Sequence, residues 1–336
     1  MKMTLLACSL ALLSAAASAN EAGLKLADMA MPHHDAKARV AIWYPSGGGG
    51  TVERYAANPV FAGVDVSRDP QIKAGVHPVV LFSHGMGGTD RAQAWLGKGL
   101  AERGAVAIMV NHPNSTAGDF DMATGVQHWT RAQDLTVALD QVAADPDFAA
   151  HLDTAQVMAT GFSYGGWTAL SLGGMTGNRD GLVNACHENA DMAACDLLLS
   201  DRVSLQTQDI DAWNASYRDA RVTQVVAIDP GFVWGLDPSD TAGLVADTIL
   251  IGLGDAETRM LATDFDRSGL AAMLPQARFE QIAPALHFTA MPICTPRGQA
   301  ILQEENDDPV CTDPPGTDRA AVHAHIIETI AAALNL

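Results

Sequence analysis

The pentapeptide GFSYG at 161–165 places Ser163 between two glycines, directly after an apolar run at 155–160. Where a strand turns straight into a helix at such a serine, the backbone is strained and the hydroxyl is exposed, and the glycines leave room for the turn. The sequence therefore predicts Ser163 as a nucleophile. An ordinary strand-to-helix turn is the alternative interpretation of the same five residues.

A serine hydroxyl is too weakly acidic to attack unaided, so it needs a histidine base and a carboxylate that fixes the histidine's tautomer. His287 follows the last expected strand and is the candidate base. Asp229 and Asp255 each follow an earlier strand. We favour Asp229, because it comes directly after its strand, whereas Asp255 opens a polar run in which a solvated carboxylate paired with Arg259 is the simpler interpretation.

Acyl transfer also needs hydrogen-bond donors in place for the oxyanion that forms. The glycine-rich turn SHGMGG at 83–88 ends an apolar run at 76–82, so its N–H groups would face the crevice at the carboxyl ends of the strands. We expect the backbone N–H groups of Met86 and Tyr164 to form the oxyanion hole. A plain strand-helix turn is the alternative, and we expect His84 to be structural.

Apolar strands and amphipathic helices alternate along most of the chain. Apolar runs predict strands at 37–43, 76–82, 105–110, 155–160, 222–228, 248–253 and 277–282. Helical periodicity predicts helices at about 91–103, 128–144 and 318–334. This order is typical of an α/β protein with a doubly wound, mostly parallel sheet. Residues 51–75 show no clear period and are expected to be coil with short turns, and 114–127 a loop.

The alternation is interrupted at about 174–222 by a polar stretch with a helical segment near 210–217. Because this insertion enters between the helix after Ser163 and the next strand, we expect it to form a cap over the crevice. A peripheral elaboration of the fold is the alternative.

The first residues combine a basic start, an apolar run at 5–17 and small residues at 17–19. This pattern predicts a signal peptide at 1–19, which leaves 20–336 as a single domain in the periplasm or outside the cell. A membrane anchor and a lipoprotein attached at Cys8 are the alternatives. No later segment reaches the length of a membrane span, so we expect no integral membrane segment after signal removal.

Four cysteines remain after signal removal, and an even number in an exported chain suggests two disulfides. Three pairings are possible. We favour the local pairing of Cys186 with Cys195 and Cys294 with Cys311, since each pair brackets a polar or proline-rich loop.

The chain has 20 Lys and Arg against 39 Asp and Glu, a formal net charge of -19. This charge opposes binding to nucleic acid or to anionic membrane surfaces, and solubility is its expected role. The expected partner, a small-molecule or lipid-like ester, follows from the predicted triad. His323 and His325 are two residues apart in an expected helix and so do not share a face, which argues against a metal site there.

At these same residues the sequence resembles a known family. The motifs HPVVLFSHGMGG, GFSYGG and VVAIDPGFVWG, with the segment around LHF, are similar to α/β-hydrolases that group secreted platelet-activating-factor acetylhydrolases with bacterial dienelactone-hydrolase-like esterases. The resemblance spans about 38–295. It implies the α/β-hydrolase fold, an oxyanion hole at Met86 and Tyr164, and Asp229 as the acid. True dienelactone hydrolases use a cysteine where this chain has Ser163.

These features together predict an exported serine esterase that cleaves carboxylic esters through an acyl-enzyme, without a metal or organic cofactor. The resemblance favours short or medium acyl groups. A lipase or polyester hydrolase is the alternative within the same chemistry. A binding protein on a catalytically dead hydrolase scaffold is the alternative of another class, and it is disfavoured because no triad position is missing.

Overall fold

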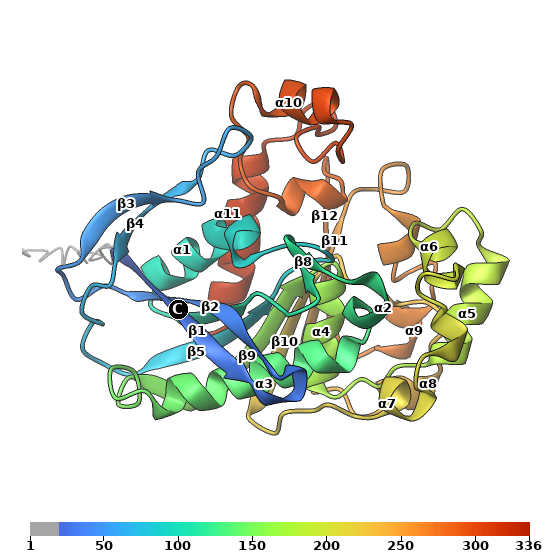
Figure 1. Ribbon diagram of the computed structural model, residues 1–336, viewed down its shortest axis with the longest axis horizontal. Coiled ribbons are helices and arrows are strands. Elements are labelled where there is room, and N and C mark those ends of the chain that lie inside the picture. The colour runs from blue at the N-terminus through green and yellow to red at the C-terminus, as the bar shows by residue number, and fades with distance from the viewer. Residues whose placement is uncertain (1–19) are drawn as a thin grey trace, which may run out of the picture.

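The computed structural model describes residues 20–336, so the predicted signal peptide at 1–19 lies outside the described residues. A sheet of ten strands crosses the molecule in the order β12-β11-β10-β9-β5-β6-β2-β1-β4-β3 (Figure 1). Its strands are β1 Ala22–Met31, β2 Ala36–Pro45, β3 Thr51–Tyr55, β4 Val64–Arg68, β5 His77–Ser83, β6 Val106–Val110, β9 Leu152–Phe162, β10 Val222–Ile228, β11 Asp247–Leu253 and β12 Arg278–Ile282. The small hairpin β7 Ser115–Thr116 and β8 Asp119–Phe120 stands apart from this sheet.

The six strands from β12 to β6 run parallel, whereas β2 is antiparallel to both β6 and β1. All side chains of β5 and β6 are buried, as expected for strands covered on both faces. The predicted doubly wound, mostly parallel sheet is therefore confirmed.

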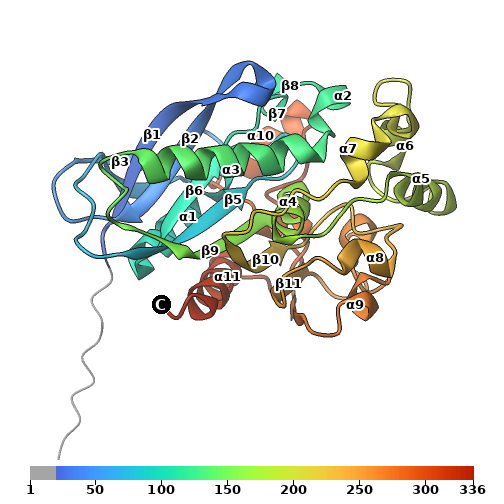
Figure 2. The ribbon, with the colours of Figure 1, turned by 90° about the horizontal axis from the view of Figure 1, so that it is seen from below.

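Helices cover both faces of the sheet. One face packs against α3 His128–Ala144 and α4 Tyr164–Gly173, and the other against α1 Ala94–Arg103 and α11 Arg319–Ala333. Figure 2 shows α3 lying along one side of the strands. The shorter helices are α2 Met122–Gly125, α5 Arg179–Glu188, α6 Cys195–Leu199, α7 Ile210–Asn214, α8 Pro238–Thr241, α9 Leu270–Met273 and α10 Gly298–Glu305. The 3-10 turns are η1 Pro32–His34, η2 Asp90–Gln93, η3 Leu205–Thr207, η4 Leu261–Thr263 and η5 His287–Ala290.

Two expectations for the irregular regions were wrong. Residues 51–75 contain β3 and β4, which pair antiparallel at the edge of the sheet. The edge strand β3 buries little surface and has charges in its middle, and β4 beside it has only two buried residues, so both leave a weak pattern in the sequence. The expected loop at 114–127 contains the β7–β8 hairpin and α2. Strand β1, which pairs with β2 over its whole length, was not anticipated either.

The insertion at 174–222 folds into α5, α6, η3 and α7, which lie together at the end of the molecule opposite β3 and β4 (Figures 1 and 2). These elements have a small apolar core of their own, centred on Leu182, Leu198, Leu205 and Trp213. The insertion is therefore a packed layer and not an open loop.

Both disulfides have the local pairing. Cys186 and Cys195 are joined with a Cα–Cα distance of 5.3 Å, and Cys294 and Cys311 with one of 5.9 Å. The first ties α5 to α6, and the second closes the loop that holds α10.

No helix within residues 20–336 combines the length and the hydropathy that a membrane crossing requires.

His128 and His323 are buried, and neither ring hydrogen-bonds to an acidic side chain of residues 20–336. His128 is enclosed by the rings of Trp129, Trp167 and Trp213, and His323 stacks on Trp95 with ring centroids 3.8 Å apart. Burial lowers the pKa of each imidazole to about 4. In the unfolded chain both imidazoles regain the ordinary value of about 6.5. Between these values the unfolded state binds more protons, so acid favours unfolding.

We therefore predict that the free energy of unfolding falls as the pH is lowered from about 6.5 to about 4, by up to about 3 kcal/mol for each of these histidines. Urea unfolding at a series of pH values measures this. His323→Gln keeps a donor for the Thr289 carbonyl, which His323 Nε2 contacts at 3.0 Å, and removes the titration. Its stability should decline less steeply than that of the wild type or of the exposed control His325→Gln. An equally steep decline would contradict the assignment.

Candidate active site

Ser163 occupies the single residue between β9 and α4, with φ 58° and ψ -121°. Its N–H donates to the Ile228 carbonyl of β10 at 2.9 Å, which holds the turn against the neighbouring strand. A Cβ at Gly161 would lie 2.1 Å from the Gly165 carbonyl oxygen, and one at Gly165 would lie 1.9 Å from the Ser83 carbonyl oxygen. Only glycine fits at these two positions, and Ser163 has the strained backbone that the sequence predicts, with a side chain of intermediate exposure.

The structure brings His287 and Asp229 to this serine. His287 begins η5 just after β12, and its Nε2 lies 3.0 Å from Ser163 Oγ, while its Nδ1 lies 2.5 Å from Asp229 Oδ2. Asp229 is fully buried and accepts further hydrogen bonds from the Leu253 N–H at 3.1 Å and the Thr263 hydroxyl at 2.9 Å. With Nδ1–H donating to the carboxylate, Nε2 is free to accept the serine proton.

The competing carboxylate, Asp255, lies elsewhere. It is exposed, and its Oδ1 accepts hydrogen bonds from the N–H groups of Glu257 and Thr258. These hydrogen bonds lower the pKa of Asp255. The expected pairing of Asp255 with Arg259 is wrong, because the guanidinium of Arg259 instead contacts Asp264 and Asp266.

Met86 and Tyr164, whose N–H groups are the expected oxyanion donors, line the same cavity as Ser163. Among residues 20–336, neither the N–H of Met86 nor that of Tyr164 donates a hydrogen bond. The 83–88 turn is closed by the Gly88 N–H, which donates to the Gly85 carbonyl at 3.0 Å. Both donors are thus available to an incoming oxygen atom.

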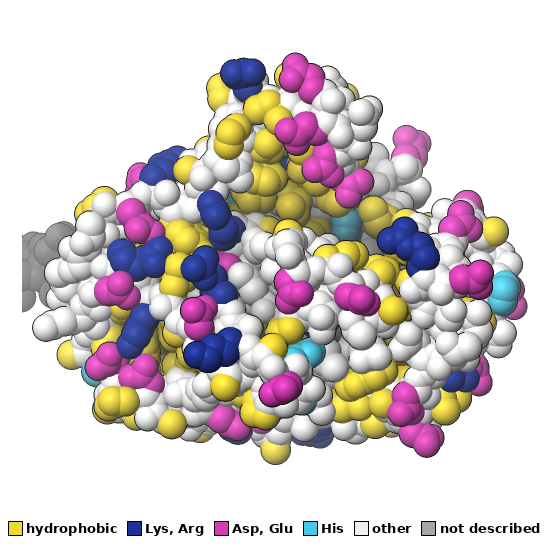
Figure 3. All heavy atoms as spheres, in the orientation of Figure 1, with side chains coloured by type: hydrophobic (Ala, Val, Ile, Leu, Met, Phe, Trp, Pro, Cys, Tyr) yellow, Lys and Arg dark blue, Asp and Glu magenta, His cyan; other side chains and the backbone are white. Residues whose placement is uncertain are grey.

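The cavity beside Ser163 has a volume of about 240 Å³ and is lined mainly by apolar side chains. One wall comes from the insertion, through α5, α6 and the loop between them: Leu182, Cys186, Met192, Ala193, Ala194, Cys195, Leu197 and Leu198. The insertion thus covers part of the crevice, and its disulfide belongs to the wall. Figure 3 shows hydrophobic side chains gathered in a hollow below the lobe that carries α10.

A buried cation that the sequence analysis missed supports this site from behind. Arg131 of α3 donates to Ser83 Oγ at 2.9 Å and to Ser115 Oγ at 2.6 Å, and it also bonds the His84 carbonyl. Its guanidinium lies 4.3 Å from the centre of the Tyr164 ring, and burial lowers its pKa to about 10. Arg131 therefore contacts both segments that carry the expected oxyanion donors.

Arg131 could have been found from the sequence. Arg131 and Asp134 share the apolar face of the 128–144 helix with Leu135 and Ala138, and two charges on a core-facing stripe are a signal of a buried polar network.

His84 is structural, as expected. It is buried, its Nδ1–H donates to the Gly85 carbonyl at 2.7 Å, and the His112 N–H donates to its Nε2 at 3.3 Å. Burial, with Arg131 nearby, holds the pKa of His84 well below its usual range. The neutral ring therefore braces the 83–88 turn.

The side chains of His323 and His325 in α11 do not point toward a common position. His323 contacts the Thr289 carbonyl, whereas the exposed His325 has its Nε2 3.2 Å from Glu280 Oε2.

No protein-family model and no curated protein matches the chain. A ferulic acid esterase from Streptomyces cinnamoneus is 18% identical, with 96% of this chain and 91% of that one covered at a TM-score of 0.60. A dienelactone hydrolase-like promiscuous phosphotriesterase from metagenomic libraries is 15% identical, with 94% and 99% covered at a TM-score of 0.53. At these identities the likeness concerns the fold.

Removing the Arg131 guanidinium should be costly. We predict that Arg131→Met lowers the free energy of unfolding by about 3 kcal/mol, because it leaves buried acceptors without a donor. Arg54→Met is the matched control, since Arg54 pairs with Asp65 at an exposed site and should lose less than about 1 kcal/mol. Urea unfolding measures both variants, and equal losses would show that the buried network adds nothing.

Proposed function

Given the α/β-hydrolase fold of this chain, we propose that it hydrolyses carboxylic esters through an acyl-enzyme, with Ser163 as nucleophile, His287 as general base and Asp229 as the acid. The observation that carries the proposal is the unbroken line of hydrogen-bond contacts from Ser163 Oγ through His287 to a buried carboxylate. These three residues, with the free N–H groups nearby, meet the geometric needs of acyl transfer.

The reaction would run in two halves. Ser163 Oγ attacks the ester carbonyl carbon while His287 Nε2 takes its proton, and the N–H groups of Met86 and Tyr164 bind the oxyanion. The protonated His287 then gives this proton to the departing alcohol, which leaves an acyl group on Ser163. In the second half a water molecule attacks the acyl carbon while His287 Nε2 takes its proton; the bond between the acyl carbon and Ser163 Oγ then breaks, His287 returns the proton to Oγ, and the acid is released. Asp229 keeps Nδ1–H of His287 in place throughout.

The lining of the cavity supports an apolar, uncharged substrate group. Met86, Met122, Phe232 and Trp234 surround Ser163 together with the insertion, and the volume is about 240 Å³. We propose that this cavity takes a short or medium acyl chain, with the insertion acting as a cap. A lipase or polyester hydrolase would instead accept long or insoluble substrates, so a series of p-nitrophenyl esters of increasing chain length distinguishes these possibilities.

We also propose that the protein is exported, and that it belongs to the family of α/β-hydrolases that its motifs resemble. The two disulfides support folding in an oxidising compartment, the periplasm or the cell exterior. Membership of the group of secreted platelet-activating-factor acetylhydrolases and dienelactone-hydrolase-like esterases rests on the motif resemblance alone.

We predict that Ser163→Ala abolishes hydrolysis of p-nitrophenyl esters and labelling by a fluorophosphonate probe, while circular dichroism and thermal unfolding stay close to wild type. The hydroxyl is the reacting group and no part of the core. Turnover above a few per cent of wild type would refute Ser163 as the nucleophile. Failure of the intact wild-type protein to react with the probe would favour a binding protein on a hydrolase scaffold.

We further predict that Asp229→Asn lowers turnover by a factor on the order of 10⁴, because the amide cannot hold the required tautomer of His287. Asp255→Asn is the matched control at the end of the neighbouring strand and should keep nearly full turnover. Comparison of kcat for the two variants checks this. A crippled Asp255→Asn beside an active Asp229→Asn would reverse the assignment.

A further inference from the structure

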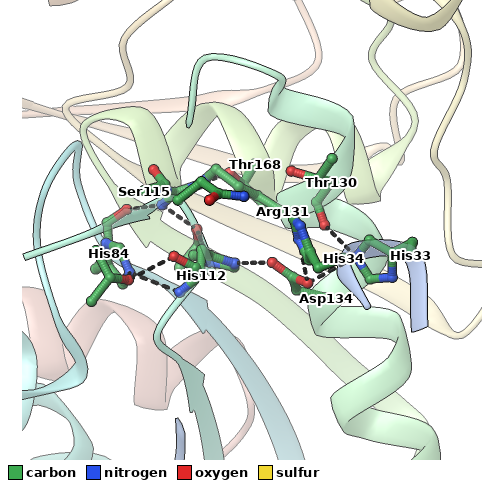
Figure 4. Close-up of polar contacts among 12 residues, drawn as sticks. His33, His34, His84, His112, Ser115, Thr130, Arg131, Asp134 and Thr168 are labelled. Atoms are coloured by element: carbon green, nitrogen blue, oxygen red, sulfur yellow. Dashed lines mark hydrogen bonds and ion pairs between the residues drawn. The ribbon is translucent and has the colours of Figure 1, made fainter. Parts of the chain in front are cut away.

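A second cluster of ionisable side chains lies outside the cavity, where the turn between β1 and β2 meets α3 (Figure 4). His33 and His34 come from η1 in that turn, and Asp134 comes from α3. The Nε2 atoms of His33 and His34 lie 2.8 Å and 3.2 Å from the same oxygen, Asp134 Oδ1. All three ligand atoms lie within 4.8 Å of one another. Two imidazoles and one carboxylate oxygen therefore face a common point.

One of these nitrogens lies near the carboxylate without a well-aligned hydrogen bond. The side chain of His34 is 6% exposed, and its Nε2 makes no hydrogen bond to any residue of 20–336, although Asp134 Oδ1 is only 3.2 Å away. A buried polar atom without a hydrogen bond is uncommon and calls for a ligand. His33 differs, because its Nε2–H donates to Asp134 and lies 3.3 Å from the Thr130 carbonyl.

The carboxylate is held in a fixed orientation. The second oxygen of Asp134 accepts a hydrogen bond from His112 Nδ1–H at 2.8 Å, and His112 Nε2 accepts one from the Ser83 hydroxyl at 2.9 Å. Asp134 and His112 are both fully buried. Hydrogen-bonded support of a ligating carboxylate is the usual outer shell of a metal site. Only Oδ1 is left to point toward the two histidines.

We propose that His33, His34 and Asp134 bind one divalent transition-metal ion of the zinc type. Imidazole nitrogen and carboxylate oxygen are ligands that zinc prefers, at bond lengths of about 2.0 to 2.2 Å. Ligand atoms around a tetrahedral zinc ion are then separated by about 3.3 Å, close to the two spacings to Asp134 Oδ1. The side chain of His33 is 20% exposed, so the ion can enter there and keep water as its fourth ligand.

The ion would take the place of the hydrogen atom between His33 Nε2 and Asp134, so the neutral ring would carry its one proton on Nδ1 and only a protonated imidazole would release a proton to solvent. It would also join η1 to α3, two elements about a hundred residues apart in the chain. The role is structural: none of the three ligands contacts Ser163, His287 or the cavity between them.

The test uses the full mature chain without a histidine tag, stripped with EDTA and titrated with ZnCl₂ by calorimetry. We expect one zinc ion per chain with micromolar or tighter affinity, a higher Tm with zinc, and reversal by EDTA. His33→Gln/His34→Gln should weaken binding at least tenfold. The matched control His325→Gln removes another histidine beside a carboxylate, Glu280, and should bind like wild type.

The proposal is overturned if wild type binds zinc no more tightly than the double variant, or if His325→Gln is the variant that loses binding. His33→Gln alone, at the exposed position, gives the same comparison if the double variant does not fold. Ser163→Ala should bind zinc as wild type does. Loss of the proposed esterase activity and loss of the metal site can thus be told apart.

Discussion

The change from strand to helix at Ser163 takes a single residue, and the rest of the site is arranged around that turn. The positive φ of the serine is held by its hydrogen bond to Ile228 of β10 and by the glycine contacts with β5, so three adjacent strands fix one hydroxyl. His287 comes after β12 and Asp229 after β10, so both reach this hydroxyl from the same edge of the sheet. The parallel order of the strands makes this convergence possible, because their carboxyl ends share that edge.

The fold contains a second hydrogen-bonded series of a serine, a histidine and an aspartate. Ser83, His112 and Asp134 are joined at 2.9 Å and 2.8 Å, nearly the spacing of the series at Ser163, yet all three are fully buried. The Ser83 hydroxyl also accepts a hydrogen bond from Arg131, and because it is fully buried it cannot reach a substrate. Ser163, unlike Ser83, lines a cavity, and the N–H groups of Met86 and Tyr164 beside it have no partner among residues 20–336. Residue type and spacing alone therefore do not identify a nucleophile.

The strength of the local sequence pattern explains what could be predicted from the sequence. Buried parallel strands and amphipathic helices have strong periodic patterns, so β10 and α3 were predicted with the bounds that the structure shows. Ser163 and Asp229 could be singled out because each directly follows a strand whose last residues are buried, and His287 because it follows the last expected strand. Edge strands such as β3 bury little and leave a weak pattern. The position of Arg131 and Asp134 on the apolar face of their helix indicates a buried polar network, but their partners lie far apart in the chain and no local pattern identifies them.

Helix α3 links these parts of the molecule. Its Arg131 faces the 83–88 turn and the Tyr164 ring, while Asp134, one turn further on, faces His112 on one side and the β1–β2 turn on the other. A buried cation and a buried anion on one helix would each be costly alone, but shared hydrogen-bonded neighbours such as Ser83 connect them. The rigidity of the expected oxyanion donors therefore depends on charges that never touch the cavity. Asp134 also contacts His33, which lies in the turn between the antiparallel strands β1 and β2. These two strands therefore help to hold the buried hydrogen-bond network behind the site.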